Sequence, residues 1–457
     1  MGKKFDFDYI IIGSGPAGRA AALTLSKSKK LHIAIVEGDK FGGSAINTRD
    51  IPYSVGLNFA YEYMNFVNYP EFRGQSIHYN LPTAVSHSEF ITSEIKKASA
   101  KEFEDAGITR IDGAANFLGP NKIAVGVKEY TAKYFIIATG DKLKCNEISG
   151  LENVSHLTPA TALKARRLPK AILVVGGGST GCEIAEYYAA LGSKVLIMER
   201  AEHLLPREDK EVGDTIASYF KNELGIMVLT NCKVVALEQD NLSKRVVFST
   251  NHQEKVVRVE TVVLATGSEP ILDYGLENAG VKFKNTGILV NKLFQTSAKN
   301  IFAIGDAIGG SDTSIERAEY EGTILASNIL NKSKSLVNYS GFVRVTNTYP
   351  EIAVVGMNEY DLLKRDQKCK RATVKLDTIL PSKVTGNTYG FVKILADHSG
   401  KLIGATIVAP GASSMIAELS LAIRHRLTVL ELASTPHIAL NNSNAIKLAA
   451  KQLITKK

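Results

Sequence analysis

The stretch Ile10-Ile11-Ile12-Gly13-Ser14-Gly15-Pro16-Ala17-Gly18 decides how the first part of this chain folds. A helix-prone segment follows over 19–27, and a second apolar run over 31–36 ends in Glu37. The order strand, glycine turn, helix, strand, acid predicts a βαβ unit. In such a unit the first glycine allows the tight turn and the second lets a pyrophosphate approach the backbone. The third glycine lets helix and strand pack closely.

The same pattern recurs in the middle of the chain. An apolar run over 172–175 leads into Gly176-Gly177-Gly178-Ser179-Thr180-Gly181, a helix-prone stretch covers 182–191, and a strand over 194–198 precedes Glu199. The amino end of each helix offers unpaired N–H groups and a favourable dipole to a phosphate, and the terminal acid can accept from a ribose hydroxyl. One such motif is a weak signal, but two complete copies predict two dinucleotide sites.

Three other strand-like runs end in small residues or an acid. Ala138-Thr139-Gly140 and Ala265-Thr266-Gly267 suit a close approach of the backbone to a cofactor. Ile304-Gly305-Asp306 presents a carboxylate beside a glycine, which can accept hydrogen bonds from a polyol chain. Beyond about residue 338 no glycine fingerprint recurs. Strand-like runs, an amphipathic helix over 413–425 and a last helix over 443–453 predict an α+β domain suited to an oligomer interface.

Composition bounds the function. The 457 residues suffice for two or three domains, and 45% hydrophobic with 22% charged residues is ordinary for a globular protein. The net charge of +9 is spread along the chain, and the basic cluster at 364–371 is short and lacks interleaved aromatics. We therefore expect a solvated loop there and no nucleic-acid partner. No run of 18 apolar residues occurs, so no membrane partner is expected.

The cysteines form no metal or redox motif. Four are present, Cys145, Cys182, Cys232 and Cys369, and none is in a CxxC spacing. Scattered cysteines fit buried thiols in a reducing compartment. No signal-peptide pattern precedes the first glycine loop, so we expect a cytoplasmic protein without a bound metal.

The order of all these segments resembles the pyridine-nucleotide–disulfide oxidoreductases, which include lipoamide dehydrogenase, mercuric reductase, glutathione reductase and the soluble transhydrogenase. The resemblance covers essentially the whole chain and continues through 349–356 and 404–408. It implies an α/β fold with two Rossmann-like domains for FAD and NAD, a C-terminal α+β dimerisation domain, and a homodimer. The implied domains are residues 1–142 and 265–335 for FAD, 143–264 for NAD(P), and 336–457 for dimerisation.

The resemblance also assigns cofactor-binding residues. FAD would be held by Gly13, Gly15, Gly18, Glu37, Gly140, Gly305 and Asp306. The nicotinamide dinucleotide would be held by Gly176, Gly178, Gly181, Glu199 and Gly267. Glu199 can accept from a 2′-hydroxyl and repels a 2′-phosphate, which favours NAD(H) over NADP(H), although Arg200 directly after it works against this preference.

The chain departs from the family where the dithiol should be. After Gly42-Gly43 the family usually shows a Cys-x4-Cys pair, and here those positions are Ala45 and Asp50. Neither can form a thiolate or a disulfide. The family lysine near the flavin falls on Ser54, while its usual carboxylate partner remains as Glu183. For Glu183, a candidate catalytic residue, we expect a raised pKa or a new cation partner.

The C-terminal acid–base motif is also lost. The family ends in His-x-His-Pro-x-x-Ser-Glu, whose second His and Glu form an acid–base pair across the dimer. Here the His position is Ala439 and the Glu position is Asn444, and His437 matches the first His. His437 is open to recruitment as a proton donor, but with no identified partner a structural role is favoured.

These losses shape the predicted function. Hydride transfer from a nicotinamide to a flavin needs no cysteine, so we predict an FAD-dependent NAD(P)H oxidoreductase without disulfide reductase activity. Its small-molecule electron acceptor would be oxygen, a quinone, another flavin or a second nicotinamide. The segment 47–52 looks like the soluble transhydrogenase and 405–435 like mercuric reductase, so the acceptor stays open. The alternative is a catalytically silent FAD- and NAD-binding redox sensor.

Overall fold

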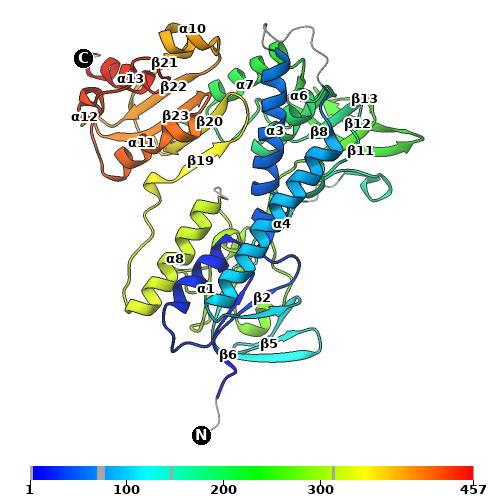
Figure 1. The fold of residues 1–457 in the computed structure, drawn as a ribbon, viewed down its shortest axis with the longest axis vertical. Coiled ribbons are helices and arrows are strands. Elements are labelled where there is room, and N and C mark those ends of the chain that lie inside the picture. Colours follow the sequence, from blue (N-terminus) through cyan, green and yellow to red (C-terminus); the bar gives the residue numbers. More distant parts are fainter. Residues whose placement is uncertain (1–3, 69–77, 145–147, 311–313, 456–457) are drawn as a thin grey trace. The chain divides into compact units, whose positions relative to one another are not determined.

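The computed structural model describes residues 4–68, 78–144, 148–310 and 314–455, and the chain forms two compact units (Figure 1). Cys145 lies outside the described residues. None of the helices in the described ranges is long and apolar enough to cross a membrane. Unit 1 comprises Met1–Gly56, Pro82–Cys145 and Gly267–Val337, and unit 2 comprises Leu57–Leu81, Asn146–Thr266 and Asn338–Lys457.

Unit 1 is built on a mainly parallel sheet. Its parallel strands, in spatial order, are β3 (Thr109–Asp112), β2 (Ile33–Glu37), β1 (Phe7–Ile12), β6 (Lys128–Ile137) and β18 (Ile301–Ala303). The amino-terminal part of β6 continues antiparallel into β5 (Lys122–Val125) and β4 (Ala115–Gly119). Two small antiparallel pairs are β7 (Asp141–Leu143) with β15 (Ser268–Pro270), and β16 (Phe283–Lys284) with β17 (Gly287–Ile288).

The continuous apolar run at β1 follows from burial on both faces of this sheet. Ile10 and Ile12 enter one hydrophobic core, whereas Tyr9 and Ile11 enter the core on the other face. Parallel sheets are covered on both sides, so their strands are apolar at every position instead of at alternate ones.

Two helices of unit 1 pack side by side over one face of the sheet (Figure 1). They are α1 (Pro16–Ser26) and α8 (Ile315–Asn331). A Cβ at Gly322 would lie 2.3 Å from the Ala17 carbonyl oxygen, so the two helix backbones touch there. This contact packs α8 against the first turns of α1, which follow the first glycine loop.

Unit 2 contains a second parallel sheet and a separate antiparallel one. The parallel order is β10 (Met227–Leu229), β9 (Lys194–Met198), β8 (Ala171–Val175) and β14 (Thr261–Leu264), with α6 (Ser179–Ala190) following β8. The antiparallel sheet joins β11 (Cys232–Asp240), β12 (Ser243–Thr250) and β13 (Gln253–Val259). Strand β8, helix α6 and strand β9 form the βαβ unit predicted from the second glycine motif.

The C-terminal part of unit 2 is an α+β layer structure, as the sequence predicted. Its antiparallel sheet runs β19 (Val343–Thr346), β20 (Glu351–Gly356), β23 (Leu402–Ala409), β22 (Phe391–Ala396) and β21 (Lys370–Lys375). Helices α11 (Ala412–Arg424), α12 (Val429–Ser434) and α13 (Asn444–Thr455) lie on it and share one hydrophobic core with it (Figure 1). The remaining helices are α2 (Gly43–Asn47), α3 (Asp50–Asn68), α4 (Leu81–Asp105), α5 (Pro159–Ala162), α7 (Lys210–Glu223), α9 (Glu359–Lys364) and α10 (Leu380–Thr385).

Candidate cofactor site

The first glycine loop has the geometry that its sequence demands. Gly13 has a φ of +105°, and a Cβ there would lie 2.1 Å from the Ala138 carbonyl oxygen. A Cβ at Gly18 would lie 2.0 Å from the Gly13 oxygen, whereas one at Gly15 would meet nothing within 4 Å. Gly13 and Gly18 therefore serve the turn and the packing, while Gly15 faces open space. A pyrophosphate needs such space against the backbone.

The amino end of α1 is ready for an anion. Its N-cap is Gly15, which provides no side-chain hydrogen bond to the helix. The first N–H groups of a helix have no intrahelical partner, and the helix dipole favours negative charge there. Glu37 lies at the end of the neighbouring strand and contacts the loop. Its Oε2 accepts from the Ser14 N at 2.9 Å and from the Ser14 Oγ at 2.5 Å. Its Oε1 accepts from the Asp39 N at 3.0 Å.

The second glycine loop repeats this construction in unit 2. A Cβ at Gly176 would lie 2.3 Å from the Ala265 oxygen, and one at Gly181 would lie 1.9 Å from the Gly176 oxygen. Gly178 faces open space and caps α6 without a side-chain hydrogen bond. In both loops the first glycine thus packs against the alanine carbonyl of an Ala-Thr-Gly strand end.

Glu199 occupies the same place in the second loop as Glu37 does in the first. Its Oε2 accepts from the Gly177 N at 2.6 Å and its Oε1 from the Ala201 N at 2.7 Å. The side chain is buried, whereas the neighbouring Arg200 is exposed. A fixed carboxylate at the end of the second strand is the feature that meets a ribose hydroxyl in this kind of fold.

The glycines that end the two Ala-Thr-Gly motifs, Gly140 and Gly267, both belong to unit 1. The Lys144 N donates to the Gly267 oxygen at 3.0 Å, and the Ile271 N donates to the Gly140 oxygen at 3.3 Å. A Cβ at either glycine would meet nothing within 4 Å. Gly267, which the sequence assigned to the nicotinamide site, is therefore grouped by the structure with Gly140 in unit 1.

Gly305 and Asp306 follow β18 in unit 1. The Gly305 N donates to Glu321 Oε2 at 2.7 Å, and the fully buried Glu321 is held in turn by Arg317 at 2.8 Å. A Cβ at Gly305 would lie 3.0 Å from the Ala17 side chain, close to the first glycine loop. Asp306 is thus anchored beside α1, which fits its expected role toward a polyol chain.

The sequence argument missed an ion pair in this part of unit 1. Arg49 Nη1 donates to both carboxylate oxygens of Asp141, at 2.9 and 3.2 Å. The Asp141 side chain is 6% exposed, and that of Arg49 is 31% exposed. Asp141 comes directly after Ala-Thr-Gly and Arg49 directly before the second lost cysteine position, so their places in the motifs were the available signal.

Two further carboxyls share the field of Arg49. Burial raises the pKa of Asp306 to about 6, and the charge of Asp141 adds to this shift. Burial also raises the pKa of Asp50, although Arg49 opposes the shift. Both groups nevertheless reach solvent, Asp50 as an exposed residue and Asp306 as a half-buried one. The charges of Arg49, Asp50, Asp141 and Asp306 thus influence one another within unit 1.

The positions of the lost dithiol and lysine have different surroundings. Ala45 is buried within α2, and Asp50 begins α3. Ser54 is exposed on the first turns of α3. A small apolar side chain and an open carboxyl therefore stand where two sulfurs would have to meet, so no disulfide chemistry is available from these two positions.

Glu183 has an amide neighbour. Its Oε1 accepts from the Asn347 N at 2.8 Å and from the Asn347 Nδ2 at 3.2 Å. The sequence missed Glu186, one turn further along α6, which is completely buried and accepts from the Tyr349 N at 2.9 and 3.0 Å. Burial raises the pKa of Glu186 well above its usual range, against the effect of this hydrogen bond.

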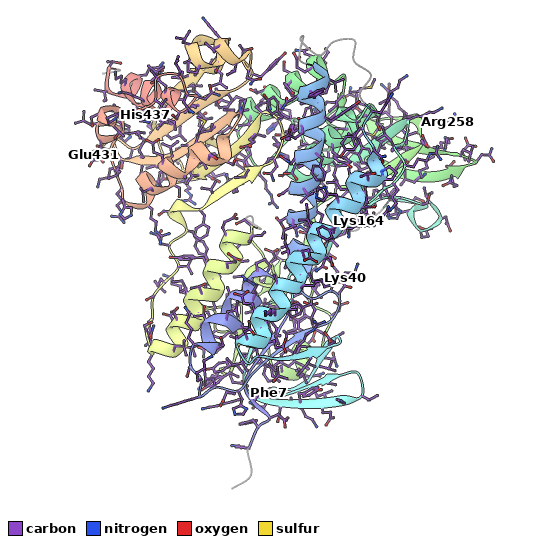
Figure 2. All side chains as sticks on the ribbon, in the orientation of Figure 1. Phe7, Lys40, Lys164, Arg258, Glu431 and His437 are labelled. Carbon is purple, nitrogen blue, oxygen red and sulfur yellow. The ribbon has the colours of Figure 1, made fainter. Side chains whose placement is uncertain are left out.

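His437 acquires a partner that the sequence did not identify. Its Nδ1 lies 2.9 Å from the Thr435 oxygen, and its Nε2 lies 3.0 Å from Glu418 Oε1 without hydrogen-bond geometry. Figure 2 labels His437 in the C-terminal part of unit 2. The His437 side chain is only 3% exposed. Ala439 is exposed, and Asn444 begins α13. The two lost acid–base positions are therefore not rebuilt in place.

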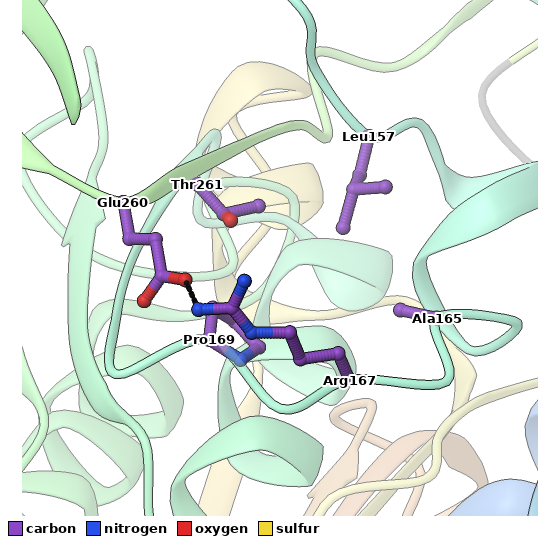
Figure 3. A pocket seen from close by; sticks show the side chains of 6 residues that line it. All are labelled: Leu157, Ala165, Arg167, Pro169, Glu260 and Thr261. Atoms are coloured by element: carbon purple, nitrogen blue, oxygen red, sulfur yellow. Dashed lines mark hydrogen bonds and ion pairs between the residues drawn. The ribbon is translucent and has the colours of Figure 1, made fainter. Parts of the chain in front are cut away.

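A pocket of about 220 Å³ lies at the opposite end of the parallel sheet of unit 2 (Figure 3). Pro169 precedes β8, and Glu260 and Thr261 stand at the start of β14, so this pocket faces the amino ends of the strands. Arg167 and Glu260 pair across it at 2.8 Å. Ligands of open α/β sheets bind at the carboxyl ends, where Gly176 lies, so this pocket is not the dinucleotide site.

One of the cysteines in the described residues is less buried than the sequence predicted. Cys182 and Cys232 are buried as expected, but Cys369 is partly exposed because it lies on the loop before β21.

Three acids of unit 2 lie close together. Carboxylate oxygens of Asp209, Glu211 and Glu359 lie within 4.8 Å of one another. The ammonium of the fully buried Lys393 pairs with all three, so a cation already fills the centre of this cluster.

The chain therefore contains two βαβ units, and the first helix turn of each is free of a side-chain cap. In each unit an acid at the end of the second strand, Glu37 or Glu199, accepts from the glycine loop. This arrangement is typical of oxidoreductases that bind two dinucleotides. The open space at Gly15 and Gly140 and the uncapped amino end of α1 fit FAD. Residues 7–322 match the pyridine nucleotide-disulphide oxidoreductase family, and residues 343–450 match its dimerisation domain. The chain belongs to the pyridine nucleotide-disulphide oxidoreductase family, whose members bind FAD and NAD(P). This confirms the resemblance and the fold class predicted from the sequence.

Individual relatives agree with this assignment. The mercuric reductase of Bacillus cereus is 30% identical over 452 residues, which cover 97% of this chain and 71% of that protein. The dihydrolipoyl dehydrogenase of Chlamydia pneumoniae is 29% identical and aligns over 94% of each chain. Among solved structures, LpdA from Mycobacterium tuberculosis matches with a TM-score of 0.87 at 25% identity, over 97% of this chain and 99% of its own.

Proposed function

We propose that this chain is an FAD-dependent NAD(P)H oxidoreductase that passes electrons to a small acceptor other than a dithiol or disulfide. The observation that carries the proposal is the combination of two complete dinucleotide loops with Ala45 and Asp50 at the cysteine positions. The named relatives include a mercuric reductase and a dihydrolipoyl dehydrogenase. Activities that require a redox-active cysteine pair are not expected here, because a carboxylate and a methyl group cannot exchange with sulfur.

The residues of this chain have defined tasks in the proposal. In unit 1, Gly13, Gly15 and Gly18 bring the α1 amino end to the pyrophosphate, Glu37 faces the ribose, and Gly140, Gly305 and Asp306 border the polyol side. Bound FAD would supply the two-electron exchange with a nicotinamide. Residues 1–142 and 265–335 would form the FAD-binding domain around these groups.

The second loop would hold the nicotinamide dinucleotide in residues 143–264. Gly176, Gly178 and Gly181 prepare the α6 amino end, and Glu199 favours a free 2′-hydroxyl, so NAD(H) is the preferred dinucleotide. Gly267 lies just beyond the end of this domain, where its carbonyl oxygen accepts from the Lys144 N. The match of residues 343–450 to the dimerisation domain supports a homodimer formed through residues 336–457.

The test is anaerobic addition of NADH to the FAD-loaded protein, followed by a panel of acceptors. We expect rapid bleaching of the visible flavin band, a slower response to NADPH, and reoxidation by a quinone or oxygen. Oxidised lipoamide and glutathione should leave the reduced protein unchanged. Absence of bleaching would instead favour a redox sensor that binds both dinucleotides, and turnover of either disulfide would refute the proposal.

A further inference from the structure

A buried ion pair on α8 holds the loop that follows β18. The Glu321 side chain is fully buried, and its Oε2 accepts from the Gly305 N at 2.7 Å. Its Oε1 accepts from the Arg317 Nε at 2.8 Å, so one carboxylate joins the loop to the guanidinium. Arg317 in turn donates from Nη2 to the Gly309 oxygen at 3.0 Å. The pair therefore contacts this loop at both of its ends.

Asp306 lies between these two contacts. Residues Gly305–Ile308 form a short 3₁₀ turn, and the Gly309 N donates to the Asp306 oxygen at 3.0 Å, which closes the turn. A Cβ at Gly310 would lie 2.8 Å from the Arg317 Nη1, so the guanidinium also packs against the backbone just beyond the turn. Side chains of α8 thus fix the backbone that carries the Asp306 carboxylate.

The residue after Glu321 connects α8 to the helix of the first glycine loop. A Cβ at Gly322 would lie 2.3 Å from the Ala17 oxygen and 3.1 Å from the Ala21 N, so the backbones of α8 and α1 touch at this point. Two consecutive residues of α8 therefore contact the two elements that the proposed function assigns to the polyol chain and to the pyrophosphate of FAD.

We propose that Arg317 and Glu321 are positioning residues of the FAD site, which set the place of Asp306 relative to the amino end of α1. This inference rests on the proposed function and adds two residues to its FAD site. The pair acts through the backbone on either side of Asp306 and not by contact with the cofactor. Such support is required because a binding group has to be held within about 0.5 Å of its productive position by the residues behind it.

A purely structural role of the pair makes a different prediction. Replacing both partners of a buried ion pair by apolar side chains is often neutral or stabilising, whereas removal of one partner strands the other charge. Arg317→Met/Glu321→Met should therefore be more stable than either single variant. The double variant nevertheless lacks the acceptor for the Gly305 N and the donor for the Gly309 oxygen, so it separates the positioning of Asp306 from the stability of unit 1.

The experiment compares FAD with ADP, because ADP carries the pyrophosphate but lacks the polyol chain. FAD affinity is measured from the change in flavin fluorescence on binding, and ADP affinity from the displacement of bound FAD, which reports on the FAD site alone. Hydrogen exchange of peptides covering 301–310 and 13–26 is followed in the cofactor-free protein. The variants are Arg317→Met, Glu321→Met and the double variant. Glu319→Met is the matched control, because its side chain is 46% exposed on the same helix.

We expect Glu321→Met and the double variant to bind FAD about tenfold or more weakly and ADP within about twofold of the wild type, since a hydrogen bond to a charged group is lost on the polyol side only. In these variants the 301–310 peptide should exchange faster, while the 13–26 peptide keeps its wild-type rate. Arg317→Met should show the same pattern to a smaller extent, because Glu321 can still accept from the Gly305 N. Glu319→Met should behave as wild type.

The outcomes separate this inference from the proposed function. Absence of bleaching by NADH in the FAD-loaded protein defeats the proposed function, while FAD binding, ADP binding and hydrogen exchange still judge the positioning role. Three results would each overturn the positioning role alone. They are an equal loss of FAD and ADP affinity, recovery of FAD affinity in the double variant together with its stability, and unchanged exchange of the 301–310 peptide.

Discussion

Replacement of Lys393 by methionine tests how unit 2 is held together. The Lys393 ammonium is completely buried and pairs with Asp209, Glu211 at 2.5 Å and Glu359 at 2.9 Å. These acids belong to the segment that begins α7 and to α9, whereas Lys393 lies on β22. Methionine keeps much of the side-chain volume but leaves three carboxylates without their common cation.

The expected cost follows from the burial of the acids. Removing one partner of a buried ion pair costs about 3–5 kcal/mol, because the remaining charge is stranded. Asp209 is 6% exposed, but Glu211 and Glu359 are 39% and 26% exposed and can regain some hydration. We therefore expect the low end, about 3 kcal/mol. At about 2–4 °C per kcal/mol for a unit of this size, the melting temperature should fall by about 6–12 °C.

The pH dependence of the loss gives a second check. Burial raises the pKa of Glu359, but hydrogen bonds from Lys393 and Arg371 outweigh this and lower it overall, so this stabilisation is lost as pH falls through the folded value. Burial lowers the pKa of Lys393, but its three carboxylate partners raise it overall, so this stabilisation is lost as pH rises through the folded value. The deficit of Lys393→Met should be largest between the usual values of 4.5 and 10.5 and shrink on either side.

The assay is thermal and urea unfolding followed by circular dichroism across this pH range. The matched control is Arg371→Met, because Arg371 pairs with the same Glu359 at 2.8 Å but is 63% exposed. An exposed pair contributes about 0–1 kcal/mol. If Lys393→Met costs no more than Arg371→Met, or if its deficit persists unchanged in acid, the buried ammonium does not stabilise the cluster as argued.

Three further changes test the cofactor sites. Gly18→Ala should lower the melting temperature of the cofactor-free protein, measured by calorimetry, because its Cβ would lie 2.0 Å from the Gly13 oxygen. Gly15→Ala should leave this temperature unchanged but weaken FAD binding, measured as retained flavin, because its Cβ meets no protein atom within 4 Å. Glu199→Ala should reduce the preference for NADH over NADPH in the rate of flavin bleaching, and an unchanged ratio would contradict the role given to this carboxylate. Burial raises the pKa of Asp306 to about 6, and the negative charge of Asp141 adds to this shift. Ionised Asp306 therefore destabilises the folded chain above about pH 6, and this free-energy cost falls as the pH drops toward the usual pKa of 3.8. Asp306→Asn should therefore stabilise the cofactor-free protein at pH 7 and flatten its stability between pH 6 and 4, while retaining less FAD.

The sequence predicted those parts of the fold that depend on neighbouring residues. The glycine spacing, the apolar run before it and the acid after it are local, and each produced the expected strand, turn and helix within a few residues. The same holds for the C-terminal α+β domain, where period and length identify α11 and α13. These elements follow from backbone geometry and burial, which act over a few residues at a time.

The interactions that the sequence could not supply join residues far apart in the chain. Arg49 and Asp141 are 92 positions apart, and Lys393 and Asp209 are 184 apart. The pairing of Arg49 with Asp141 follows from sheet order, since β1 lies between β2 and β6 and so brings the segment after β2 close to the end of β6. A charged residue next to a motif was visible, but its partner depended on which strands become neighbours.

This difference explains why the sequence identified the loss of the family's cysteine pair but left the electron acceptor open. Loss of a thiol removes its reaction whatever the surroundings are, so the proposed absence of disulfide exchange rests on Ala45 and Asp50 alone. Gain of a new reaction requires several groups to meet, as Arg49 and Asp141 do from positions far apart in the chain. Because such arrangements depend on long-range topology, the motifs of the sequence leave the electron acceptor open.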